Sequence, residues 1–224
     1  KSVEPMDSST QNLFAFTITK EPLPDPLVDR LSSSARRRFH AMAHAAYEGD
    51  NCCISQIEEF LKEYPHLPKP YNFLASLYMN NGENEKGEAV IKEMYAKFPR
   101  YLFAKIAYAK LCMASSHIHE FEKIFEGKYN LKQLYPDRDE FHISELIAFT
   151  DVLCEHACHK RNFDFVRKTL QAFKSMDLDY QGIVKIIKDR LDHFENLSVM
   201  DRMLSKIQRS RKPGDKKLRF NLNY

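Results

Sequence analysis

Residues 70–99 read PYNFLASLYMNNGENEKGEAVIKEMYAKFP, and this stretch decides the fold. Its second half is an amphipathic run that ends at Pro99, because the residue before a proline is pushed out of the helical region. Two further amphipathic runs end in the same way, at Pro65 and Pro136, each after a tyrosine. These prolines lie 34 residues before and 37 residues after Pro99. Such a regular spacing predicts a helical repeat architecture.

Residues 70–99 also resemble a tetratricopeptide repeat, a helix–turn–helix unit of about 34 residues. Ile91 and Met94 depart from the usual residues of that motif but are apolar, so the departures concern packing. The matching positions are two aromatic residues, a leucine with a small neighbour, a turn glycine, a small contact residue in the second helix and a terminating proline: Tyr71, Tyr78, Leu74, Ala75, Gly82, Gly87 and Pro99.

Weaker versions of the repeat cover residues 35–65, 101–136 and 140–178. Residues 101–136 keep the length but lose the turn glycine. The resemblance implies an all-α fold in which stacked helical hairpins form a right-handed superhelix over residues 31–178. Another kind of α-helical hairpin array is the alternative. One hairpin cannot bury its apolar face alone, so neighbouring hairpins must stack to form a continuous core.

Composition predicts an all-α fold independently of the resemblance. The chain has only six glycines, and no proline lies between Pro136 and Pro213, whereas sandwich or barrel strands need turn residues at short intervals. No run of 18 apolar residues is present, and no signal peptide is visible at the beginning. Five cysteines, two of them adjacent, suit reduced thiols. We therefore expect a cytoplasmic protein.

The segments outside the repeats have different expected roles. Residues 1–30 form an arm that is extended or partly disordered, with a docked strand near residues 13–19 as one alternative. Residues 179–209 carry an apolar stripe at helical spacing, which predicts one long helix or two helices broken near Ser198. We expect this stripe to cap the repeat array in a monomer, with a dimer interface as the alternative. Residues 210–224 are a basic tail, expected to be disordered.

The sequence CEHACHK at residues 154–160 has the density of cysteine and histidine that is found around zinc. Four ligands on one straight helix cannot surround one ion as a tetrahedron. We therefore expect Cys154 and Cys158 on the core face and His156 and His159 on the surface, with no metal. His40 and His44 have the spacing of a zinc-protease helix, but Ala41 stands where the general-base glutamate is required.

No motif in the chain predicts catalysis. A phosphate-cradling glycine loop and a nucleophile elbow are both missing from the sequence. We expect no catalytic residue, no cofactor and no enzyme activity, and a helical enzyme is an alternative. The net charge of +3 comes from the tail, because residues 206–219 hold seven basic residues and one aspartate. Nucleic acid or an anionic surface bound through this tail is the alternative function.

The resemblance implies a protein–protein interaction scaffold that holds a partner segment in a concave groove. In this family the first helix of each hairpin lines the groove, so residues on those helices are the expected contacts. Amides would bind backbone groups, charges would orient the partner and methionine would give adaptable apolar contact. The expected groove residues are Lys69, Asn72, Ser76, Met79, Asn80, Ile106, Lys110, Met113, Asp151, Glu155 and His159.

Overall fold

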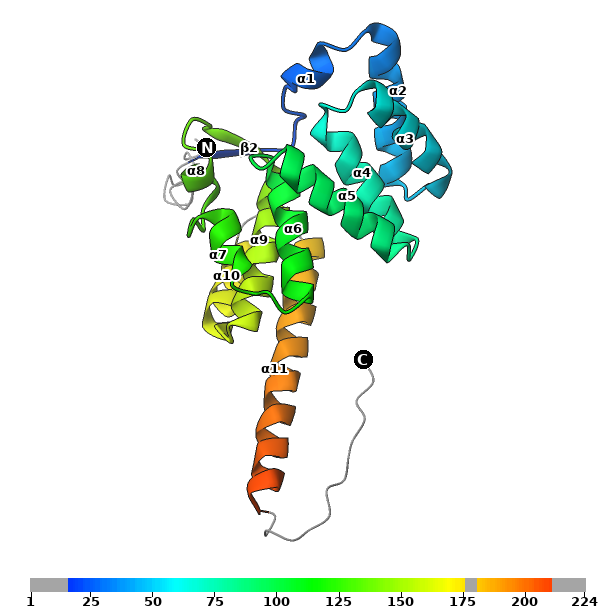
Figure 1. Cartoon of the computed structure of the whole chain (residues 1–224). Helices are drawn as coiled ribbons and strands as arrows, with labels where there is room; N and C mark the ends of the chain where they lie inside the picture. Colours follow the sequence, from blue (N-terminus) through cyan, green and yellow to red (C-terminus); the bar gives the residue numbers. More distant parts are fainter. Residues whose placement is uncertain (1–15, 176–180, 211–224) are drawn as a thin grey trace, which may run out of the picture. The chain divides into compact units, whose positions relative to one another are not determined.

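A computed structural model of the chain describes residues 16–175 and 181–210, with only the backbone described at 181 and 204–210. Helices make up nearly all of the regular structure in this part of the chain, so the expected all-α class is confirmed (Figure 1). The chain divides into two compact units after His156, within one helix, and each unit is described by itself.

The first unit contains stacked helices that follow one another along the chain (Figure 1). Its elements are β1 (Thr17–Thr19), α1 (Pro26–Asp29), α2 (Ser33–Tyr47), the 3-10 turn Asn51–Cys53, α3 (Ile54–Glu63), α4 (Pro68–Asn80), α5 (Asn84–Lys97), α6 (Leu102–Ala114), α7 (Glu120–Phe125), α8 (Leu131–Leu134), β2 (Glu140–His142) and most of α9 (Ile143–His159).

The three aromatic residues before the repeated prolines end helices, as the sequence predicts. Tyr64, Phe98 and Tyr135 are the C-caps of α3, α5 and α8, with φ of −127°, −129° and −130° and ψ of 59°, 60° and 73°. These dihedral angles lie outside the helical region, because the proline ring disfavours a helical residue before it.

One turn motif recurs after the first helix of each hairpin. A residue with left-handed φ donates its N–H to the carbonyl three residues earlier, and the next N–H reaches the carbonyl five residues before it. This pair of bonds is the usual way to satisfy the last carbonyls of a helix. In the described residues the left-handed positions of the four turns are Gly49, Gly82, Ser116 and Arg161, with φ of 74°, 78°, 63° and 57°.

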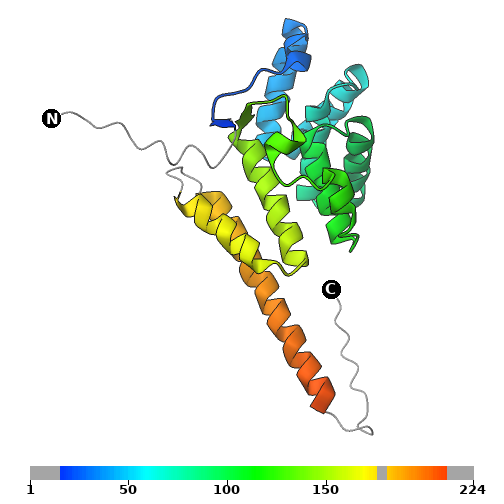
Figure 2. The same ribbon diagram turned by 90° about the vertical axis from the view of Figure 1, so that its left-hand side faces the viewer.

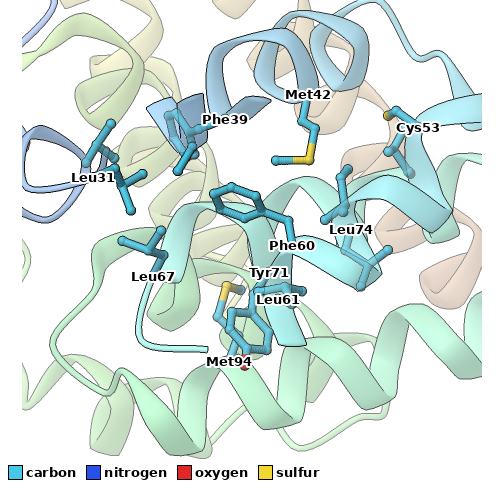
Figure 3. Close-up of a cluster of buried hydrophobic side chains, with 14 of the residues drawn as sticks. Leu31, Phe39, Met42, Cys53, Phe60, Leu61, Leu67, Tyr71, Leu74 and Met94 are labelled. Atoms are coloured by element: carbon cyan, nitrogen blue, oxygen red, sulfur yellow. The ribbon is translucent and has the colours of Figure 1, made fainter. Parts of the chain in front are cut away.

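Buried side chains from α2, α3, α4 and α5 form one hydrophobic cluster (Figure 3). Phe60 and Met94 are fully buried, and Leu74, the leucine of the repeat motif, is 5% exposed. Gly87 allows α4 and α5 to approach closely, because a Cβ added there would lie 2.5 Å from Sδ of Met79. The small residue that the repeat pattern expects at this point therefore has a packing reason.

The third hairpin departs from the expected pattern. The sequence predicts one amphipathic run that ends at Pro136, but the structure divides it into α7 and α8. Glu126 and Gly127 have left-handed φ of 55° and 66°, and the N–H of Gly127 bonds to the carbonyl of Glu122. Two consecutive left-handed residues cannot continue a right-handed helix, so α7 ends after only six residues.

The arm expected at residues 1–30 is docked where the structure describes it. Thr17–Thr19 pairs in parallel with Glu140–His142, in the register Thr17 to Glu140. Asp25 caps α1 through its carboxylate, and Val28 is 5% exposed. Of the two alternatives, the docked strand is therefore the one found for residues 17–19. Residues 1–15 lie outside the described residues.

The second unit contains the end of α9, α10 (Phe163–Ser175) and α11 (Gln181–Ser210). α10 packs beside the first part of α11, where Ile183, Ile187 and Leu191 are buried (Figure 2). α11 is one continuous helix of 30 residues, so the alternative of two helices broken near Ser198 is wrong. The expected disordered tail falls on residues 211–224, which lie outside the described part. Whether α11 caps the array or joins two chains stays a prediction.

Candidate functional site

A cavity of about 1030 Å³ lies in the first unit, and we call it the main cavity. The first helix of each hairpin contributes to its lining, as does an extended segment at residues 22–26. The lining residues include Pro22, Leu23, Pro24, Asp25, Ala43, Tyr47, Lys69, Arg100, Tyr101, Phe103, Tyr135, Arg138, Glu140, His142 and Glu145. Concave sites of this volume are the usual places for a bound ligand or peptide.

The segment at residues 22–26 is held at both of its ends. Before it, β1 pairs with β2, and Nε2 of His142 lies 3.3 Å from the carbonyl oxygen of Lys20. Near its other end, the carboxylate of Asp25 lies 2.7 Å from Nζ of Lys69. The segment is therefore a fixed wall of the main cavity.

Aromatic side chains give the main cavity an apolar surface with polar ends. Tyr47 is 88% exposed, which is unusual for so large a side chain, and the rings of Tyr101 and Phe103 lie 5.6 Å apart. Burial and the nearby charge of Glu145 raise the pKa of Tyr135 to about 12. Burial also raises the pKa of Tyr101. Both phenols are protonated at neutral pH, and the single O–H of Tyr135 already donates to the backbone carbonyl of Arg100.

Most charged side chains in the main cavity already have partners. Arg138 forms two bonds to the carboxylate of Glu145, at 2.9 and 2.8 Å, and its guanidinium lies 4.3 Å from the centre of the Phe141 ring. Arg100 differs, because no carboxylate in the described residues lies within 4 Å of its guanidinium. Its backbone carbonyl accepts a bond of 2.8 Å from the hydroxyl of Tyr135. The position of residue 100 is thus fixed while its charge is available.

The residues expected to form a groove along α4 have varied surroundings. Lys69 lines the main cavity and pairs with Asp25. Asn72 is half-buried, and Ser76 and Asn80 are exposed. Met79 is 40% exposed but covers Gly87 of α5. Of these five, only Lys69 is among the residues that line the main cavity.

The groove residues expected on α6 need a correction. Ile106 is 6% exposed and Met113 is 1% exposed, so neither offers a surface to a partner. The reason is that α6 is packed by α5 and α7 as well as by α4, so more of its surface is covered than one groove-facing helix would allow. Lys110 reaches Asp151 of α9 at 2.5 Å, and Asp151 is 8% exposed. This ion pair joins the first helices of the third and fourth hairpins.

The last two expected groove residues fall on either side of the division between the units. Glu155 belongs to the first unit and is half-buried. His159 belongs to the second unit, where its ring packs edge-on against Phe194 at 4.9 Å. Neither residue lines the main cavity.

In the CEHACHK stretch, the prediction for the cysteines is confirmed and one histidine prediction is wrong. Cys154 is fully buried and Cys158 is 1% exposed, on the core face. His156 was expected on the surface but is only 6% exposed. Its ring stacks on Phe121 of α7 at 3.9 Å, with 8° between the ring planes. His156 is buried because α7 covers the side of α9 on which periodicity predicts polar, exposed residues.

The other histidine pairs are in exposed positions. His40 and His44 lie on the outer side of α2, and His117 and His119 lie at the turn before α7. Within residues 16–175 and 181–210, no three histidine, cysteine or acidic side chains gather as metal ligands would. The same residues contain no helix that is both long and apolar enough to span a membrane.

Sequence reasoning missed most of the residues that line the main cavity. Arg100, Tyr101 and Phe103 follow Pro99 directly, and that proline drew attention only as the end of a helix. An aromatic and basic cluster immediately after a helix terminator was the signal available. Tyr47, which comes two residues before the turn at Gly49, gave no signal of its own.

Comparisons with known proteins add no assignment to this site. No protein-family model matches the chain, and no curated protein or solved structure matches it either.

Proposed function

We propose that the first unit is a tetratricopeptide-like scaffold that binds an extended segment of a partner protein in the main cavity, without enzyme activity. The repeated helix ends, the recurring turn and the close approach at Gly87 support the repeat assignment. In such arrays the first helices of successive hairpins face one concave surface, and the main cavity is lined by the first helix of each hairpin.

The observation that carries the proposal is the lining of the main cavity. Tyr47 and Phe103 offer aromatic surface, while Arg100 offers a cation that has no carboxylate within 4 Å in the described residues. Tyrosine and arginine are the residue types that contribute most to binding energy in protein interfaces. The backbone groups of an extended chain are unpaired, and the exposed hydroxyl of Tyr47 can donate a hydrogen bond to one of its carbonyls.

The proposed partner segment is extended and carries an acidic residue near an apolar one. An acidic group would pair with Arg100, and an apolar side chain would pack against the aromatic rings. The proline-rich wall at residues 22–26 has few backbone N–H groups to offer, so side chains would make most contacts on that side.

The test is a selection of peptides from a random library on the intact chain, followed by affinity measurements with a labelled selected peptide. We expect Tyr47→Ala and Arg100→Ala each to weaken binding by about tenfold, equivalent to about 1.4 kcal/mol. Tyr47 is so exposed that its loss should leave the fold unchanged. The control is Tyr129→Ala, which removes a 45% exposed tyrosine that does not line the main cavity. Unchanged affinity in both cavity variants would refute the proposal.

A further inference from the structure

A second cavity, of about 240 Å³, lies beside the third hairpin. We call it the second cavity. Its lining contains three basic residues, Arg100, Lys105 and Lys123, and one acidic residue, Glu126. Arg100 and Tyr135 line the main cavity as well. Basic residues in this lining therefore outnumber the acidic one.

Lys105 is the buried member of this group. The residue is 8% exposed, and its Nζ donates one bond of 2.6 Å to the carbonyl of Ile124 in the last turn of α7. The carboxylate of Glu126 lies 3.8 Å away, beyond hydrogen-bond distance, and is held by Lys128 at 2.6 Å. An ammonium group has three donors, so this arrangement leaves hydrogen-bonding capacity at Lys105. Burial lowers the pKa of Lys105, and the negative charge of Glu126 opposes this effect.

Arg100 brings a second cation to the same cavity. Its guanidinium has no carboxylate within 4 Å in the described residues, and the bond from Tyr135 to its carbonyl fixes its backbone. Lys123 is the third basic residue in this lining, but it is exposed and already paired with Glu120 at 2.7 Å. Arg100 and Lys105 therefore both line this cavity, neither has a hydrogen-bonded carboxylate among the described residues, and Lys105 is nine-tenths buried.

A purely structural role explains only part of this arrangement. A lysine at the C-terminal end of a helix is stabilised by the helix dipole, and the bond from Lys105 to Ile124 fits that role. The helix end accounts for neither the open volume beside Lys105 nor the presence of Arg100. An anion of the right size would account for both, because a buried charge is stable when it is paired and hydrogen-bonded.

We propose that the second cavity binds a small oxyanion, a phosphate or a carboxylate, which is held mainly by Lys105 and Arg100. The site does not depend on peptide binding in the main cavity. Because Arg100 lines both cavities, an oxyanion carried by a partner segment and a free anion are both sources of this chemistry.

The test is calorimetric titration of the intact chain with inorganic phosphate and, separately, with acetate, at constant ionic strength with chloride as background. We expect saturable binding of at least one anion, weakened at least tenfold by Arg100→Ala and lost in Lys105→Met. Saturable binding of phosphate alone assigns the site to phosphate, and binding of acetate assigns it to carboxylates. The control is Lys62→Ala, which removes an exposed lysine of α3 that lines neither cavity.

Two results would overturn this proposal. One is the absence of saturable heat with either anion, and the other is unchanged affinity in Arg100→Ala. Lys105→Met removes the bond to Ile124, so its circular dichroism must match that of the unaltered chain before its result counts. Arg100 is exposed, so Arg100→Ala tests the site even if the lysine variant does not fold. The titrations contain no peptide, so failure of the peptide-binding proposal would leave their outcome unaffected.

Discussion

The second and third hairpins show how a regular and an irregular version of the same unit differ. Their first helices, α4 and α6, both have 13 residues, but the second helices, α5 and α7, have 14 and 6. The regular hairpin contributes mainly to the hydrophobic cluster. The shortened one leaves Ile124 and Glu126, at the end of α7, beside the second cavity. This candidate site therefore lies beside the irregular hairpin.

The two hairpins also close their turns with different residues in the same conformation. Gly82 and Ser116 both have left-handed φ, and both turns form the same pair of backbone bonds. Glycine adopts this conformation without steric cost, whereas serine does not. The turn of the third hairpin therefore has a steric cost that the turn of the second does not have.

The largest effect that we expect concerns the core of the irregular hairpin. Phe125 is fully buried, so Phe125→Ala should lower the free energy of unfolding by about 3–5 kcal/mol. The matched change in the regular hairpin, Leu74→Ala, should cost about 2–5 kcal/mol. Urea denaturation of the intact chain measures both changes in unfolding free energy. The control is Ser76→Ala at an exposed position, which should change that free energy by less than about 0.5 kcal/mol. A loss below about 1 kcal/mol for Phe125→Ala would mean that the third hairpin lies outside the core.

A smaller effect should follow from a change in the regular turn. Gly82 has φ of 78°, and a Cβ there would meet no atom within 4 Å. Any loss of stability in Gly82→Ala must therefore come from the backbone conformation. We expect the free energy of unfolding to fall by about 1–2 kcal/mol. Thermal unfolding of the variant measures this loss. If the variant is as stable as the unaltered chain, the left-handed turn is not a constraint in this hairpin.

The smallest effect should be a gain of stability in the irregular turn. Ser116→Gly removes the steric cost of a left-handed serine, so stability should rise by about 1 kcal/mol. The adjacent Ser115 has φ of −86°, and glycine there brings only additional freedom to the unfolded chain. Ser115→Gly is thus a matched control that should not stabilise. Equal effects at both serines would contradict the explanation of the turn.

Local sequence was sufficient to predict helix ends and the inner face of the regular hairpin. The residues before Pro65, Pro99 and Pro136 end helices because the proline ring acts on its immediate neighbour, whatever packs around it. Helical periodicity placed Cys158 on the core face, the resemblance to the repeat motif placed Leu74 at its leucine position, and both residues are buried. The site was predicted less well, since Lys69 alone of the expected groove residues lines the main cavity.

The sequence by itself determined the all-α class, the spacing of the hairpins and the proline and glycine signals that separate their helices. Only the tertiary structure decided that His156, Ile106 and Met113 are buried and that Ser116 and Arg161 take the turn conformation of glycine. The physical reason is that periodicity indicates one packed face for each helix. In a stack, helices distant in the sequence, such as α7 against α9, cover further faces, and those contacts also determine where the cavities lie.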